Sequence, residues 1–324
     1  VINADWDEDI RISKFDGDGI KEWTKIYGSN SYDSVYGLTT GIDGSIFMTG
    51  GTLGNFEGQR NKNNHRSEDI HISKLDTNGN MVWTKLIGNS NQNVGVDVVQ
   101  ISDGSIYISG YTKKGLNNQN ENGDIDPFII KLNENGDQIW TRVLGTSGWD
   151  DGQRMTIGSD DSIYITGLQN GTQNNVQGDA YISKLNTNGG EEWTRSLTTS
   201  NYGNGLSTGN ALATGLDGSI YIAGRTLGNL EGEQNNGDWD GFLSKFNSNG
   251  DQQWVKLLGS SEVDIITSLS IEGDGFIYVY GETKGNLDEQ NNAGNNDTFI
   301  ANFDQEGNKN WSQLIGGEGN DYAY

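Results

Sequence analysis

An alternation of apolar and polar residues recurs along the chain in short stretches, and it predicts β-strands rather than helices. The stretch DGSIYISG, residues 103–110, shows this alternation after a turn-forming Asp-Gly pair. Close variants of this octamer begin at Asp43, Asp160, Asp217 and Asp274. A strand-turn-strand pattern such as DIHISKLDTNGNMVWTKLIG, residues 69–88, accompanies the octamers. With a moderately apolar segment before each octamer, every period predicts four short strands.

Tryptophan marks the period. Six tryptophans recur about 57 residues apart, at Trp23, Trp83, Trp140, Trp193, Trp254 and Trp311. A four-stranded unit that repeats in this way cannot bury both of its faces alone, so neighbouring units must stack. Four antiparallel strands per unit favour a ring of units, a β-propeller, over a linear β-solenoid. We therefore expect an all-β fold in which the six periodic tryptophans are structural.

The order of the patterns predicts the number of blades. Five complete four-stranded antiparallel blades begin near Ser31, Asn91, Gly148, Asn201 and Ser261. The chain opens with the outer hairpin of a blade, at 9–28, and stops inside the inner strand of another, at 321–324. Both termini together would assemble a sixth blade, whose second strand is missing, so we expect a chain truncated at its C-terminus. The prediction is a single β-propeller domain over 1–324 with six blades, and seven remain open for the full-length chain.

Charge and composition exclude several classes of ligand and of chemistry. The net charge of −24 and the pI near 4.2 argue against nucleic acid and anionic membranes, because both attract clustered Lys and Arg. The absence of cysteine excludes disulfides, thiolate metal sites and thiol nucleophiles. No apolar run has the length of a membrane helix, and no apolar signal segment follows Val1. We expect a soluble protein whose ligands are cations or neutral polar molecules.

One further pattern resembles a known family. The segment GGEGNDYAY, residues 316–324, is followed in the other repeats by the octamer and a Gly-x-Thr sequence. This arrangement resembles the bacterial β-propeller repeat proteins of the SBBP type, over essentially the whole chain. The resemblance implies an extracellular or cell-surface propeller, frequently part of a larger protein, and supplies no common catalytic residues. Long Asn- and Gln-rich insertions after the octamers depart from the family pattern.

Loop length differs between the two faces of the predicted propeller. Tight turns such as IDGS and DTNG fall on one face, whereas the long connections at 51–69, 110–126 and 224–240 fall on the other. Ligands generally bind where a rigid scaffold presents variable polar loops. We therefore expect the long-loop face to bind a glycan or a protein partner.

Two sets of residues on this face are candidate ligand contacts. The first set lies ten residues after the periodic tryptophans and would ring the channel mouth for a cation or a hydroxylated ligand: Asp33, Asn93, Asp150, Asp264 and Asp321, with Gly203 breaking the series. The second set is aromatic and would stack on sugar rings: Tyr32, Trp149, Tyr202 and Trp239. The competing structural interpretation is that the polar residues accept backbone N–H bonds and the aromatic residues pack between loops.

Calcium is the one cofactor that the sequence leaves open. Turns that alternate Asp and Asn around Gly are similar to the beginning of a calcium loop, although the later Glu ligand is missing. The candidate metal ligands are Asp16, Asp18, Asp76 and Asn78 in turns, and Asp124, Asp126, Asp238 and Asp240 where long loops re-enter a strand. A hairpin turn with a left-handed Gly explains the turn pattern without a metal.

The sequence gives little support to the hypothesis that the protein is an enzyme. The only histidines are His65 and His71, and cysteine is absent, so a catalytic triad or a zinc centre would be hard to assemble. The leading prediction is a non-enzymatic, secreted or cell-surface binding module. The alternatives are a structural spacer that contacts neighbouring modules of a larger assembly, and a carbohydrate-active hydrolase or lyase that uses paired carboxylates of the channel ring.

Overall fold

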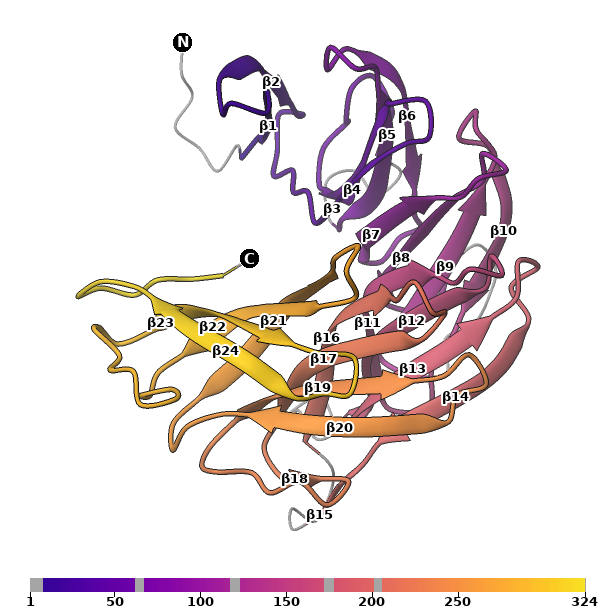
Figure 1. The fold of residues 1–324 in the computed structure, drawn as a ribbon. Coiled ribbons are helices and arrows are strands. Elements are labelled where there is room, and N and C mark those ends of the chain that lie inside the picture. Colours follow the sequence, from indigo (N-terminus) through magenta and orange to yellow (C-terminus); the bar gives the residue numbers. More distant parts are fainter. Residues whose placement is uncertain (1–7, 62–66, 117–122, 172–177, 201–205, 324) are drawn as a thin grey trace. The chain divides into compact units, whose positions relative to one another are not determined.

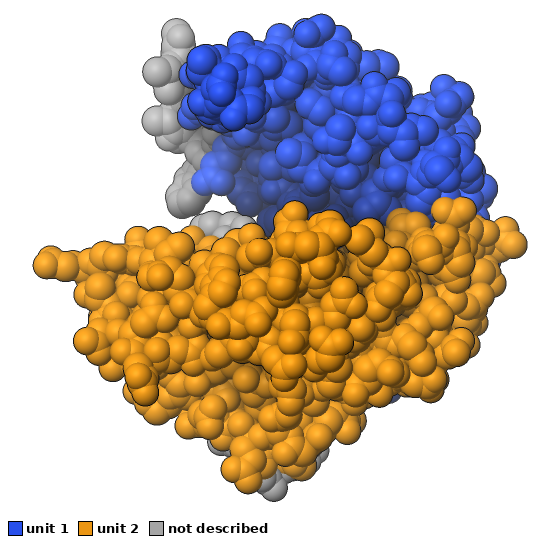
Figure 2. Space-filling model, in the orientation of Figure 1, with its two compact units in different colours: residues 1–147 blue, residues 148–324 orange. Residues whose placement is uncertain are grey.

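The computed structural model describes residues 8–61, 67–116, 123–171, 178–200 and 206–323 (Figure 1). Within these ranges the secondary structure consists of strands, bridges and turns, and we find no helix long and apolar enough to cross a membrane. The all-β prediction is confirmed. The chain divides into two compact units, Val1–Ser147 and Gly148–Tyr324, which Figure 2 colours separately. A single domain over 1–324 stays a prediction.

Unit 1 contains one hairpin and two four-stranded sheets, all antiparallel and in sequence order. The hairpin pairs β1 (Ile10–Phe15) with β2 (Lys21–Tyr27). The first sheet contains β3 (Gly37–Thr40), β4 (Ile46–Thr52), β5 (Asp69–Leu75) and β6 (Met81–Ile87). The second sheet contains β7 (Asn93–Gln100), β8 (Ile106–Thr112), β9 (Asp126–Leu132) and β10 (Gln138–Val143).

Unit 2 contains three more four-stranded antiparallel sheets. The first contains β11 (Trp149–Ile157), β12 (Ile163–Gly171), β13 (Asp179–Leu185) and β14 (Glu191–Leu197). The second contains β16 (Ser207–Thr214), β17 (Ile220–Thr226), β19 (Asp240–Phe246) and β20 (Gln252–Leu258). The third contains β21 (Asp264–Ile271), β22 (Ile277–Thr283), β23 (Asp297–Phe303) and β24 (Lys309–Ile315). A small pair joins β15 (Thr199–Ser200) to β18 (Asn229–Leu230).

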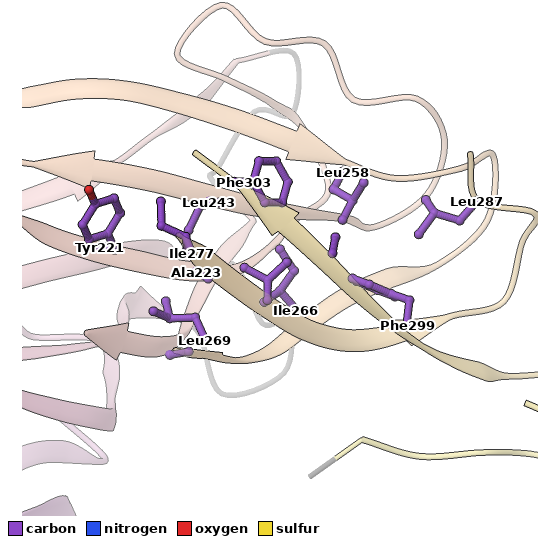
Figure 3. Close-up of a cluster of buried hydrophobic side chains, with 13 residues drawn as sticks. Tyr221, Ala223, Leu243, Leu258, Ile266, Leu269, Ile277, Leu287, Phe299 and Phe303 are labelled. Atoms are coloured by element: carbon purple, nitrogen blue, oxygen red, sulfur yellow. The ribbon is translucent and has the colours of Figure 1, made fainter. Parts of the chain in front are cut away.

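The hydrophobic core of unit 2 shows why the sheets must stack. Figure 3 shows a cluster of buried side chains that come from β16, β17, β19 and β20 of one sheet and from β21, β22 and β23 of the next. Leu243, Ile266 and Phe299 belong to this cluster, and each is at most 2% exposed. Burial of one such side chain stabilises the fold by about 1.5–3 kcal/mol. Neither sheet could cover this apolar face alone, so the predicted stacking of neighbouring repeats is confirmed here.

The periodic tryptophans are structural, as predicted. Trp193 and Trp254 lie on the fourth strands of their sheets, and each ring packs against the octamer tyrosine of its own sheet, with centroids 5.9 and 6.0 Å apart. The ring of Trp193 also covers the hairpin turn of the next repeat at Gly250, where an added Cβ would lie 2.8 Å from the indole. Gly250 has a φ of +81°, a conformation that favours glycine. The Asx-x-x-Gly turn and the tryptophan therefore recur together because they contact each other.

Candidate functional site

In five places of the described chain a backbone hydrogen bond joins the residue at the entrance of an outer hairpin to the start of the next repeat. In unit 2 the N–H of Asp264 donates to the carbonyl oxygen of Trp239 at 2.6 Å. Equivalent bonds join Asp33 to Glu8, Asn93 to Glu68, Ser207 to Gly178, and Asp321 to Asn296. We call this contact the repeat latch. Its acceptor is a backbone carbonyl, so the side chain at the acceptor position differs from repeat to repeat.

Four of the residues predicted to ring the channel donate the N–H of these latches: Asp33, Asn93, Asp264 and Asp321. Asp33, Asn93, Asp150 and Asp264 are at most 4% exposed. The Asp264 carboxylate accepts bonds from the Ser260 N–H at 2.6 Å and from its hydroxyl at 2.8 Å. The remaining bonds follow the same local pattern: Ser29 and Thr52 donate to Asp33, Thr112 to Asn93, Asn170 to Asp150, and Gly317 to Asp321. These side chains close their own loops, and a role toward a ligand stays a prediction.

A buried carboxylate also begins the third strand of each of several repeats. Asp240, at the start of β19, accepts the N–H of Asn236 at 2.8 Å and packs against Gly259, where an added Cβ would collide with it. Burial, together with a smaller effect of the nearby Asp264 carboxylate, raises the pKa of Asp240 to about 6. The same packing recurs in the pairs Asp9 with Gly28, Asp69 with Gly88, and Asp297 with Gly316.

Trp239 lines a cavity of about 770 Å³ in unit 2. The cavity lies at the long-loop end of the strands, between the entrances of β19 and β21 and beside the segment that follows β24. Its other principal lining residues are Arg225, Glu282, Lys284, Asn296 and Tyr322. A volume of this size is typical of small-molecule binding sites.

Arg225 and Trp239 form one wall of this cavity. The guanidinium carbon of Arg225 lies 4.6 Å from the centre of the Trp239 ring, which is a cation–π arrangement. Burial lowers the pKa of Arg225. Among the residues that the structure describes, no carboxylate lies within ion-pair distance of Arg225, and its buried Nε–H has no hydrogen-bond acceptor.

Glu282 forms the facing wall and holds the C-terminal segment in place. Its carboxylate accepts a bond from the Asn296 side-chain amide at 2.9 Å and one from the Ala323 N–H at 3.0 Å. The same Asn296 amide donates to the Asp321 carbonyl at 3.0 Å. Glu282 thus accepts hydrogen bonds from neutral donors, and it forms no ion pair with Arg225 in the described part of the chain.

Unit 1 has a smaller cavity at the equivalent place in its repeats. It measures about 380 Å³ and is lined by Tyr32, Leu53, Ser67, Glu68 and Gln92. Here Glu68 stands at the latch position that Trp239 occupies in unit 2, and it accepts a bond from Gln92 at 2.7 Å. The two cavities share a scaffold position and differ in chemistry.

The other predicted contacts are distributed over both units. Trp149 is half-buried at the start of β11, and Tyr202 lies outside the described residues. In the turns, Asp16 and Asp76 each accept two backbone N–H groups through one oxygen, including those of Asp18 and Asn78. Asp126 and Asp240 are buried, whereas Asp124 and Asp238 are exposed. Over the described ranges, no three His, Cys, Asp or Glu side chains are placed to hold a metal ion.

Sequence reasoning identified Trp239 but missed the side chains around it. Arg225, Glu282, Lys284, Asn296 and Tyr322 were not among the predicted contacts. A signal for Arg225 and Glu282 exists at the position directly after each octamer, one residue before the Thr that ends the strand or its equivalent. That position varies while its neighbours recur, and it is occupied by Gly51, Tyr111, Leu168, Arg225 and Glu282.

The structure repeats four-stranded antiparallel sheets that stack on one another, with a latch between successive repeats. This arrangement defines a repeat protein of the β-propeller type. Residues 253–288 match the family model described as SBBP, a beta-propeller repeat. This match confirms an SBBP-type β-propeller repeat within the chain, as the sequence resemblance implied.

The chain is similar to several known proteins. The regulatory protein FlaEY of Caulobacter vibrioides is 27% identical over 195 residues, which cover 54% of this chain and 20% of that protein. The chain thus spans a fifth of the length of that curated relative. A protein of unknown function from Dyadobacter fermentans has a TM-score of 0.52 at 10% identity, covering 87% of this chain and 82% of that one. Puromycin hydrolase has a TM-score of 0.52 at 12% identity, covering 94% and 43%. At these identities the structural likeness shows the fold alone.

Proposed function

We propose that this chain is a non-enzymatic binding module that recognises a glycan at its long-loop face, in the cavity around Trp239. The observation that carries the proposal is an indole at the wall of a cavity of about 770 Å³ whose other walls bear amide and charged groups. An aromatic ring offers a large apolar surface for the C–H face of a sugar. Asn295 and Asn320 also line the cavity and supply polar groups for hydroxyls.

The state of the nearby carboxylates favours binding over catalysis. Glycoside hydrolysis needs one carboxyl group that donates a proton and another that acts as base or nucleophile, both free to reach the substrate. Glu282 accepts two protein hydrogen bonds, and Asp264 is buried and bonded to Ser260. Both groups are engaged in holding loops, which supports a binding role.

The proposal includes the architecture around the site. We propose one six-bladed propeller over 1–324, in which the β1–β2 hairpin and the C-terminal residues contribute to a sixth blade. Asp321 makes the same repeat latch as Asp264, which supports a further repeat beginning there. A secreted or cell-surface location, and membership of a larger chain, follow from the family resemblance and stay part of the proposal.

A glycan array of the purified chain tests this function. The array is run in calcium and again in chelator, with product analysis on every hit. We expect binding without turnover, a loss of at least tenfold in Trp239→Ala, and substantial retention in Trp239→Phe. Leu216→Ala is the control, because Leu216 is 80% exposed at the opposite, tight-turn end of the strands. An array that stays blank contradicts glycan binding, and sugar products contradict the non-enzymatic role.

A further inference from the structure

The Arg225 guanidinium is unusual for a half-buried cation. The chain has 45 acidic residues against 21 basic ones, so acidic partners are abundant. Charged side chains removed from water are normally paired. Yet within the described residues Arg225 makes no ion pair, and burial is the one influence that we find on its pKa. A cation in this situation is suited to a negative charge supplied from outside the protein.

A second guanidinium–indole pair in the same unit provides the contrast. The guanidinium carbon of Arg195 lies 5.3 Å from the centre of the Trp193 ring. Its Nε–H donates to the Gly250 carbonyl at 3.0 Å, and another N–H donates to Thr194 at 2.9 Å. Arg195 therefore uses its donors to hold the scaffold. Arg225 also lies over an indole ring, but among the described residues its buried Nε–H finds no acceptor.

We propose that the cavity around Trp239 selects a glycan with a carboxylate-bearing sugar, such as a uronic acid, and that Arg225 binds the carboxylate. This inference rests on the proposed function and specifies its ligand class. The Nε–H of Arg225 is buried, so a carboxylate would bond to the terminal N–H groups of the guanidinium, which can bind both carboxylate oxygens. Lys284 is an exposed second cation at the rim. Two carboxylates, Glu262 and Glu282, also line the cavity, and neither forms an ion pair with Arg225 over the described ranges; Glu282 accepts bonds from neutral donors.

The site must act against the charge of the whole chain. A net charge of −24 repels an anionic ligand at long range, but salt screens exposed charges beyond about 8 Å at physiological ionic strength. Contact between a carboxylate and a half-buried guanidinium is screened much less. Binding of the acidic sugar should therefore persist, without weakening more than about twofold, when sodium chloride rises from roughly 20 to 150 mM.

The test is an array of uronic-acid-terminated oligosaccharides, each paired with its carboxyl-reduced neutral counterpart, followed by titration calorimetry on the tightest pair. The native chain should bind the acidic member at least tenfold more tightly. Arg225→Gln should bind both members with the affinity of the neutral one, and Arg225→Lys should keep part of the preference. Arg195→Gln is the matched control and should keep the full preference. Trp239→Ala should weaken binding of both members.

The outcomes separate this inference from the function on which it rests. Equal binding of acidic and neutral members by the native chain overturns the acidic preference and leaves glycan binding standing. Binding of neither member overturns both. A preference that survives Arg225→Gln at full strength overturns the assignment of the carboxylate to Arg225. Cooperative thermal unfolding of each variant at the native temperature confirms that a loss reflects the site rather than the fold.

Discussion

The buried histidine of unit 1 makes the stability of that unit depend on pH. His71, on β5, is fully buried and stacks on Phe56 with ring centres 4.6 Å apart. Its Nε2 lies 2.7 Å from the Ser34 carbonyl, to which it can only donate, so the neutral ring carries its proton there. Nδ1 is buried and has no hydrogen-bond partner within the described residues. Protonation would place a charge and an unpaired N–H in the core.

Burial accordingly lowers the pKa of His71 from 6.5 to about 4, and the bond to Ser34 acts weakly in the other direction. The unfolded chain takes up a proton near pH 6.5, whereas the folded chain resists it until about pH 4. The contribution of His71 to the free energy of unfolding is therefore fully present above pH 6.5. This contribution is lost as the pH falls from 6.5 to 4. At about 1.4 kcal/mol per pH unit, the loss amounts to about 3 kcal/mol.

The perturbation that isolates this effect is His71→Gln in a His65→Gln background, compared with the background alone. Glutamine keeps an N–H donor for Ser34 and cannot titrate. We expect the free energy of urea unfolding of the histidine-containing protein to fall, relative to the variant, by about 2–3 kcal/mol between pH 7.5 and 4.2. Hydrogen exchange in β5 reports on unit 1 specifically. A His71 ring that titrates near 6.5 by NMR, or an equal pH dependence in both proteins, would refute the reasoning.

Three further predictions concern unit 2. Because burial raises the pKa of Asp240 to about 6, unit 2 should lose stability as the pH rises from 3.8 to 6, and Asp240→Asn should abolish this loss in urea unfolding; an unchanged slope contradicts it. Gly259→Ala forces a Cβ into the Asp240 carboxylate and should lower the free energy of unfolding by about 1–3 kcal/mol. Gly273→Ala is the control, because an added Cβ there has no atom within 4 Å, and it should change this free energy by less than about 0.5 kcal/mol. Equal effects of the two substitutions would count against the packing argument. Glu282→Ala removes the acceptor of the Ala323 N–H and should speed hydrogen exchange across 317–323 by about tenfold or more; unchanged exchange would show that other contacts hold the segment.

The repeat architecture could be predicted from the sequence because its determinants are local. Alternation along 103–110, the Asp-Gly turn and the Asx-x-x-Gly turn each act within a few residues of the chain. In the structure the Asp103 carboxylate accepts the N–H of Ser105 at 2.7 Å, which is the turn that the octamer requires. The periodic tryptophans added the repeat length. Strand number and strand order within each sheet followed from these signals.

The cavity could not be predicted in the same way, because its walls come from segments far apart in the sequence. Arg225 meets Trp239 across a long connection, and Glu282 meets Ala323 from another repeat. A local signal did exist for the aspartates of the predicted ring. A serine stands four residues before Asp33 and Asp264 and donates to both carboxylates, so Ser-x-x-x-Asp would have indicated a closed loop.

The repeat latch separates the scaffold from recognition. Its acceptor is the main-chain oxygen of Trp239, as it is of Glu68 and Asn296 in other repeats, so the chain closes in the same way whatever side chain that residue bears. Each latch therefore tolerates any side chain at its acceptor residue. A second variable position lies nearby, directly after the octamer on the second strand of the repeat. In unit 2, Arg225 and Trp239 stand at these two variable positions. In unit 1, Gly51 and Glu68 stand at the same positions. A two-residue substitution would thus move the Arg225–Trp239 pair into another repeat without changing the main-chain contact of its latch.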